Sequence, residues 1–149
     1  MNNKPYPRAI YEPKPSKIVP GQIGLFALVN FTKGDVVTDS SNWDESRLIT
    51  WEEFETIDFA TKQRLINFCY KSKDGIEAPQ DINKINIAYY FNHSCDPLTY
   101  CDAKGNYIAL KDIKVGEELT IDVEKLMAKP TFPFNCSCGS KNCRKIVKI

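Results

Sequence analysis

Long apolar runs are missing from this sequence of 149 residues. No stretch approaches the roughly 20 consecutive apolar residues that a membrane-spanning helix needs. The first 16 residues are rich in proline and charge and lack the apolar core of a signal peptide. We therefore expect no membrane association and an intracellular location, in the nucleus if the source is eukaryotic and in the cytoplasm if it is bacterial.

An excess of charge of one sign is also missing. The chain has 20 basic and 19 acidic residues, so the whole molecule offers no strong field to nucleic acid or to an anionic membrane. We expect no direct nucleic-acid binding. A basic protein substrate would have to be recognised by a local acidic groove.

Histidine is scarce, since His93 is the one histidine, whereas cysteine occurs six times. In a secreted chain six cysteines would suggest three disulfides, but without a signal peptide reduced thiols or a metal site are favoured. We interpret Cys69 and Cys101 as small buried side chains, because their sequence neighbours are apolar or mixed. The other four form the set of interest: Cys95, Cys136, Cys138 and Cys143.

Frequent turns between short apolar segments predict a single, mostly β domain with a small helical insert. Residues 1–16 are expected to be an extended arm with little regular structure. Short strands are expected within residues 18–31, 36–37, 82–91, 107–110 and 119–123. The insert covers about 50–70, where Thr50 and Glu53 have the spacing of a capping box and apolar residues follow at helical intervals.

The most informative stretch is Asn92-His93-Ser94-Cys95-Asp96-Pro97. Its polar residues follow an apolar, aromatic run, a pattern typical of a strand that leaves the core and ends in a site. Three further segments accompany it: Gly-Gln-Ile-Gly-Leu-Phe-Ala at 21–27, Gly-Glu-Glu-Leu-Thr-Ile-Asp at 116–122, and Cys-Ser-Cys-Gly-Ser-Lys-Asn-Cys-Arg at 136–144.

Taken in chain order, these four segments resemble the SET-domain protein lysine methyltransferases, in the subgroup with a cysteine-rich post-SET tail. The resemblance runs from about Ile18 to the C-terminus. It implies a β-clip fold in which the C-terminal segment is threaded under a preceding loop, a pseudoknot that places the central motif beside the Gly-Glu-Glu-Leu strand. We divide the chain accordingly into the arm (1–16), the SET domain (17–130) and a post-SET zinc-binding tail (131–149).

The tail offers three zinc ligands, Cys136, Cys138 and Cys143. Structural zinc takes four, so one ligand is missing. The resemblance implies that Cys95 supplies it. A metal so bound would clamp the tail onto the active-site strand and contribute on the order of 10 kcal/mol to its ordering. The alternative is a tail of reduced cysteines without metal.

The resemblance also implies S-adenosylmethionine as the methyl donor. Its binding roles fall on Asn92, whose amide can both donate and accept, and on His93, whose backbone groups face the adenine edge. The glycine segment would approach the amino-acid head of the donor through Gly24, Leu25 and Phe26, since glycine permits a close backbone approach. Ile146 would cover the other face of the adenine.

Methyl transfer to lysine needs a neutral amine, although a lysine pKa near 10.4 keeps the group charged at neutral pH. A narrow, dry channel beside a cationic sulfonium lowers that pKa and aligns the reacting atoms. Aromatic rings and tyrosine hydroxyls suit the channel walls. The candidates are Tyr70, Tyr89, Tyr90, Tyr100, Tyr107 and Phe134, of which Tyr70 and Phe134 match the family's channel positions best.

The sequence departs from the family at Val123, where the family usually has a tyrosine regarded as the key catalytic hydroxyl. Either another tyrosine reaches the same point, or activity is low, or the protein is a catalytically silent SET-like binding or adaptor module. A small zinc-ribbon interaction domain would fit only the last 15 residues. A hydrolase with a carboxylate pair is disfavoured, because Glu117 and Glu118 are adjacent on a strand and face opposite ways. We interpret Glu118 as structural, with a turn or buried hydrogen-bond role.

The expected partner is a protein substrate bearing a lysine, such as a histone tail or another basic protein. We expect a monomer, with a dimer as the alternative. The number of methyl groups transferred depends on how channel hydroxyls and waters fill the space around the amine.

Overall fold

The computed structural model describes residues 5–39, 45–126 and 132–147. The remaining residues lie outside the description, and with them parts of the predicted arm (1–4), of the predicted SET domain (40–44 and 127–130) and of the predicted tail (131 and 148–149). No helix among the described residues has the length and apolar character needed to span a membrane.

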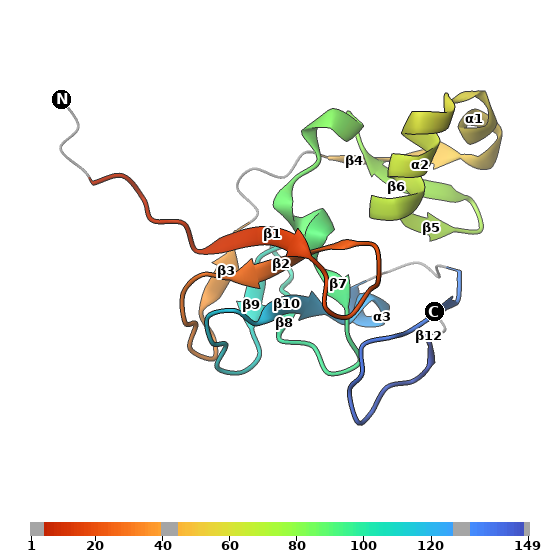
Figure 1. Ribbon diagram of the computed structural model, residues 1–149. Coiled ribbons are helices and arrows are strands. Elements are labelled where there is room, and N and C mark those ends of the chain that lie inside the picture. The colour runs from red at the N-terminus through yellow and green to blue at the C-terminus, as the bar shows by residue number, and fades with distance from the viewer. Residues whose placement is uncertain (1–4, 40–44, 127–131, 148–149) are drawn as a thin grey trace.

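The described strands form four small sheets, as the sequence predicts for a mostly β domain (Figure 1). The largest sheet has the order β1 (Tyr11–Pro15), β2 (Ile23–Ala27), β10 (Glu118–Ile121) and β7 (Asn92–His93). The other sheets consist of β3 (Val36–Thr38), β9 (Tyr107–Ala109) and β8 (Thr99–Cys101); of β4 (Ser46–Thr50), β6 (Gly75–Pro79) and β5 (Tyr70–Ser72); and of β11 (Phe134–Asn135) and β12 (Ile146–Val147).

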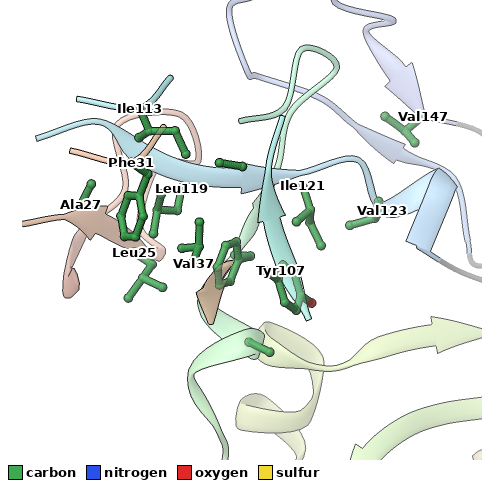
Figure 2. Close-up of a cluster of buried hydrophobic side chains, with 13 residues drawn as sticks. Leu25, Ala27, Phe31, Val37, Tyr107, Ile113, Leu119, Ile121, Val123 and Val147 are labelled. Atoms are coloured by element: carbon green, nitrogen blue, oxygen red, sulfur yellow. The ribbon is translucent and has the colours of Figure 1, made fainter. Parts of the chain in front are cut away.

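The main hydrophobic core lies between the largest sheet and the β3-β9-β8 sheet (Figure 2). Leu25 of β2 and Leu119 of β10 are fully buried there, with Ile113 from the loop that precedes β10. Val147 of β12 is also fully buried, so the C-terminal tail contributes a side chain to the core of the domain. At about 1.5 to 3 kcal/mol for each large buried side chain, this packing is the main stabilising term.

The predicted helical insert is confirmed. It contains α1 (Trp51–Thr56) and α2 (Phe59–Phe68), which pack on the β4-β6-β5 sheet and enclose a second, smaller core with Leu65 and Ile76. The Thr50 hydroxyl caps α1 by accepting from the Glu53 amide at 3.2 Å. The Glu53 carboxylate pairs with Arg47 on β4, at 2.6 Å, and so ties the helix to its sheet.

The prediction of little regular structure across residues 1–16 is wrong for its second half. Tyr11–Pro15 form β1, which pairs antiparallel with β2 from Tyr11 opposite Ala27 to Pro15 opposite Ile23. Pro13 and Pro15 are compatible with this because β1 is an edge strand. Alternate residues of an edge strand direct their backbone nitrogens away from the sheet, so two prolines spaced by two cost no ladder hydrogen bond.

The expected strand within residues 82–91 is also wrong. The segment forms two 3-10 helices, η1 (Ile82–Lys84) and η2 (Ile87–Tyr90). The Asp81 and Asn86 side chains start them by accepting from the amides two residues later, at 2.9 Å each. Such local hydrogen bonds compete with sheet pairing. The strand begins only at Asn92. The strand expected within residues 119–123 also ends earlier than predicted. β10 ends at Ile121, and Val123 begins a short helix, α3 (Val123–Leu126).

Gly75 tests the close backbone contact between β4 and β6 in the insert. An added Cβ there would lie 2.0 Å from the Ile49 carbonyl oxygen, and the φ angle is +149°. We expect Gly75→Ala to lower the free energy of unfolding by about 2–4 kcal/mol, because the methyl group meets fixed backbone. Gly34→Ala is the matched control, since Gly34 has φ +93° and nothing within 4 Å, and it should cost only the backbone term of about 1–2 kcal/mol. Equal losses in urea unfolding would contradict the steric account.

Candidate functional site

The central motif lies beside the Gly-Glu-Glu-Leu strand, as the resemblance implies. β7 pairs parallel with β10, with Asn92 opposite Thr120 and His93 opposite Ile121. The pairing continues at Ser94, whose amide donates to the Ile121 carbonyl at 2.8 Å. Residues about 30 positions apart in sequence are thereby fixed next to each other.

Asn92 connects the motif to the glycine segment. Its Nδ2 donates to the Ile23 carbonyl at 3.0 Å and to Glu118 Oε1 at 3.0 Å. Glu118 is 8% exposed and has the buried hydrogen-bond role predicted for it. Gly24 lies against the same carboxylate, because an added Cβ would be 2.3 Å from Oε1. Glycine at position 24 therefore leaves room for the Glu118 carboxylate. The sequence had instead suggested that this glycine allows the backbone to approach a ligand.

His93 is held as a neutral, buried ring. The Val123 amide donates to its Nδ1 at 3.3 Å, and its ring meets Phe134 edge to face at 5.3 Å. Burial lowers the pKa of His93; the Arg144 cation lowers it too, and the nearby Asp122 carboxylate opposes both. Nε2, the other ring nitrogen, lies 3.4 Å from the Cys95 sulfur and 3.4 Å from Nη2 of Arg144.

A cavity of about 330 Å³ collects three of the six channel candidates, Tyr70, Tyr89 and Phe134. This volume lies within the range of about 300–1,000 Å³ that small-molecule sites occupy. The described lining comes from α2, β5, η2, β7, α3, β11 and the segment before β11, and its residues include Tyr70, Tyr89, Phe91, Asn92, His93, Val123, Phe132 and Phe134. Tyr70 and Phe134, the two best channel candidates, thus share one cavity with Asn92 and His93.

The tyrosines of the cavity keep their protons. Burial raises the pKa of Tyr70, and it raises the pKa of Tyr89 to about 12. Their hydroxyls are therefore neutral donors and acceptors at neutral pH. Val123 contributes an apolar wall to the same cavity and is 7% exposed. Of the lining residues that the structure describes, Lys71 is the one with a full charge. The acidic groove expected for a basic substrate is not formed by this lining.

The other predicted residues lie elsewhere. Tyr90 packs on Phe68, with ring centroids 5.5 Å apart, and is not part of the described lining. Tyr107 stacks on Phe91 in the core, and Tyr100 lines a different cavity of about 230 Å³. Ile146 of β12 pairs with Asn135 and is half exposed.

Leu25 and Phe26 are also outside the described lining of this cavity. The Leu25 side chain is fully buried in the main core, and Phe26 is 2% exposed, with the ammonium groups of Lys14 and Lys17 over its ring. Neither side chain can reach a ligand. If these two residues contact one, they do so through their backbone.

The four cysteines of the motif and the tail form one cluster, in which all sulfur atoms lie within 4.8 Å of one another. The sulfurs of Cys95 and Cys136 are 3.7 Å apart. Bonds of about 2.3 Å from a tetrahedral zinc place sulfurs about 3.8 Å apart, so the geometry of the cluster fits that metal. Cys69 is buried, and Cys101 is half buried; both lie outside the cluster, as expected.

The thiols of this cluster differ in acidity. Burial raises the pKa of Cys138, but hydrogen bonds with the Ser140 hydroxyl and with the backbone outweigh it and lower that pKa to about 6. Burial raises the pKa of Cys136 to about 12. Four thiols this close cannot all ionise without a compensating cation, and a divalent metal ion would supply one.

Arg144 joins the cysteine cluster to His93, a role that the sequence did not distinguish from that of an ordinary solvated cation. Its backbone amide and its Nε each donate to the Cys95 sulfur at 3.3 Å. Its Nη2 donates to Asp122 at 2.7 Å, and it also pairs with Glu124. The hydrogen bond to Asp122 raises the pKa of Arg144, so the cation is permanent.

Phe132 and Lys71 were not foreseen as lining residues. The Phe132 amide donates to the Lys71 carbonyl at 3.3 Å, which attaches the segment before β11 to the insert. Ser16, likewise unforeseen, donates to Glu118 at 2.7 Å. No motif marks these residues, because each contact joins segments that are distant in sequence.

Comparisons with known proteins agree with this geometry. The chain matches the SET-domain family model over residues 22–122, more than half of its length. "Histone-lysine N-methyltransferase trithorax" of Drosophila virilis is 43% identical over 40% of this chain. "Histone-lysine N-methyltransferase 2B" of Homo sapiens is 32% identical over 42%, and "Methyltransferase flvH" of Aspergillus flavus is 31% identical over 45%.

These matches cover 2% of trithorax, 2% of the human protein and 39% of the Aspergillus protein. The matched family segment runs from the glycine turn to Asp122 and contains Asn92, His93 and Cys95. The cysteine tail follows it and forms with Cys95 a cluster of four thiols that could hold a metal ion. The chain belongs to the SET-domain family.

Proposed function

We propose that the protein is an S-adenosylmethionine-dependent protein-lysine N-methyltransferase, and that the cavity between β7 and the helical insert is its reaction site. The observation that carries the proposal is the convergence of Asn92 and His93 with Tyr70 and Phe134 on this one cavity. The division into a SET domain (17–130) and a post-SET tail (131–149) belongs to the same proposal.

The residues present suit the proposed donor. Both amide hydrogens of Asn92 are used within the protein, which leaves its Oδ1 to accept from a ligand amine. His93 lies next to it on β7, with its ring buried. When bound, S-adenosylmethionine supplies an electrophilic methyl group on a sulfonium. Asn92, His93 and the backbone at Gly24 would hold the donor, and Ile146 would lie over the adenine.

Tyr70 and Phe134 are proposed to flank the substrate lysine. Burial in a mostly apolar cavity disfavours the charged ammonium, and the neutral hydroxyl of Tyr70 can accept from the ammonium or donate to the amine. With the donor bound, the neutral amine would take the methyl group as the carbon–sulfur bond breaks, the electron pair would stay on sulfur as a thioether, and the lysine proton would go to solvent.

The substrate is proposed to be a lysine in a protein. A histone is one candidate, suggested by the names of the relatives, and it would place a eukaryotic enzyme in the nucleus. The scarcity of negative charge in the cavity lining gives no preference for a strongly basic tail, so a lysine with apolar neighbours is an equally suitable target.

A second function, a silent SET-like binding module, is favoured by one observation. Val123 lines the cavity where the family usually has a tyrosine, and a valine cannot hydrogen-bond an amine. The two functions differ in whether the Tyr70 or Tyr89 hydroxyl can replace the missing one.

Transfer of labelled methyl from S-adenosylmethionine to core histones and to a lysate of the source organism tests the proposal. We expect label on lysine from the zinc-loaded protein and none from Asn92→Ala, because that change removes a donor contact. Val123→Tyr should retain or raise activity. If the native protein gives no label and Val123→Tyr does, the silent-module function is correct instead.

The role of Tyr70 is tested by Tyr70→Phe. Loss of one hydroxyl that positions the amine should lower kcat by roughly tenfold or more, the equivalent of one hydrogen bond. Tyr100→Phe is the matched control and should leave kcat unchanged, since Tyr100 is 46% exposed and lies on another cavity. An unaltered kcat in Tyr70→Phe would exclude its hydroxyl from the reaction.

The cysteine cluster is proposed to bind one zinc ion per chain. Metal analysis should find it in the native protein and in Cys69→Ser, and should find less than half in Cys138→Ser, because a site with three thiolates is incomplete. A chelator should make residues 132–147 sensitive to protease while the insert stays resistant. Correctly folded native protein without metal would refute this.

A further inference from the structure

We propose that Ser16 and Glu118 are positioning residues for Asn92, which fix the orientation of its side-chain amide and thereby the group that it offers to the methyl donor. The inference rests on the proposed function, because it takes Asn92 as a donor ligand. Ser16 lies before the matched family segment at 22–122, so the arm would contribute to the donor site.

Glu118 is a buried acceptor surrounded by donors. Oε1 accepts from the Ser16 hydroxyl at 2.7 Å and from Asn92 Nδ2 at 3.0 Å. Oε2 accepts from the Lys17 amide at 2.7 Å. Gly24 closes off another side, since a Cβ there would be 2.7 Å from the carboxyl carbon. A carboxylate held by three donors and packed against backbone has one available orientation.

The orientation of an asparagine amide follows from its partners. Nδ2 of Asn92 faces two acceptors, the Ile23 carbonyl and Glu118 Oε1. Rotating the amide by 180° would place Oδ1 against both, with two repulsive contacts in place of two hydrogen bonds. Glu118 and Ile23 therefore select the orientation in which Oδ1 is the free group. A ligand amine is attracted to Oδ1, whereas the rotated amide would present hydrogens to it.

Ser16 holds this arrangement from the arm side. Its hydroxyl donates to Glu118 and accepts from the amides of Ile18 and Val19, at 3.1 and 2.9 Å. Its own amide donates to the Gln22 carbonyl at 2.8 Å. One side chain thus closes the loop between β1 and β2 and fixes it to β10. Without the Ser16 hydroxyl, the Glu118 carboxylate would be free to rotate. Asn92 Nδ2 would then lose Oε1, one of the two acceptors that fix the orientation of its amide.

Isothermal titration with S-adenosylmethionine and NMR of the Asn92 side-chain amide test the inference on zinc-loaded protein. Ser16→Ala should bind the donor roughly tenfold more weakly, the effect of one hydrogen bond to a charged group. The Asn92 amide signals, identified by their absence in Asn92→Ala, should shift and exchange faster with solvent. Ser16→Thr keeps a hydroxyl and should retain the wild-type donor affinity and the wild-type Asn92 amide signals. Ser46→Ala, at an exposed position on β4, is the control and should change neither.

Three further measurements separate positioning from general stability. In turnover, the loss in Ser16→Ala should fall on KM for the donor, with kcat at saturating donor within about twofold of wild type. In an Asn92→Ala background, Ser16→Ala should have no additional effect on donor affinity, because it acts through Asn92. Glu118→Gln should weaken donor binding as Ser16→Ala does, because either orientation of its amide sets hydrogens against a donor, the Lys17 amide in one and Asn92 Nδ2 in the other.

Wild-type donor affinity in folded Ser16→Ala would overturn the inference. So would weakened affinity with unchanged Asn92 signals, because Ser16 would then act by another route. If the native protein binds no donor, the proposed function fails. The Asn92 signals of the ligand-free protein then still decide the positioning role, since they report the amide without any ligand.

Discussion

The site depends on the parallel pairing of β7 with β10, which involves two residues from each strand. Parallel neighbours need a long crossover, and here residues 94–117 provide it, folding back through the β3-β9-β8 sheet. The pairing sets Asn92 within reach of Glu118, His93 within reach of the Val123 amide, and Cys95 within reach of the tail. A pair so short gains stability from the hydrophobic core, which contains Ile121 of β10 (Figure 2), and Cys95 of the cysteine cluster follows β7 by two residues.

The tail shows why such a cluster is useful. Residues 132–147 are few, only four of them have large apolar side chains, and their two strands pair over two residues each. A segment of this size cannot bury enough apolar surface to order itself. Its fixed points are Val147, fully buried in the main core, and the cysteines that meet Cys95. Phe134 pairs with Val147 across β11 and β12 and forms part of the cavity, so the proposed lysine channel requires an ordered tail.

The sequence predicted the elements whose signals are local. The helical insert, the Thr50 cap and the four-cysteine cluster follow from spacing and from the family resemblance, and each has the predicted place. The errors have physical causes of two kinds. Asp81 and Asn86 form local side-chain hydrogen bonds that turn an apolar run into 3-10 helices. Tyr11–Pro15 become a strand because β2 offers an edge to pair with, and nothing in the proline-rich sequence reveals that edge.

The candidate site likewise contains residues that a sequence motif marks and residues that only the folded structure reveals. Asn92 and His93 carry a motif, whereas the contact of Ser16 with Glu118 spans 102 residues and leaves no local trace. Tyr89 and Tyr90 are adjacent and chemically alike, but only the 3-10 turn decides which one faces the cavity: Tyr89 lines it, and Tyr90 packs on Phe68. Sequence patterns identify residue types that suit a chemistry, and packing decides which of them reach the reacting atoms.

Val123 illustrates how a motif can change without loss of the fold. His93 contacts the backbone amide of residue 123, at 3.3 Å, and any residue except proline supplies that donor. The Val123 side chain is buried and packs in the main core, so valine replaces the ring of a tyrosine with another apolar surface. What disappears is one hydroxyl. Under the proposed function, donor binding by Asn92 and His93 would not depend on the side chain of residue 123, and the change would bear on transfer alone, through the neutral hydroxyls of Tyr70 and Tyr89 that remain in the same cavity.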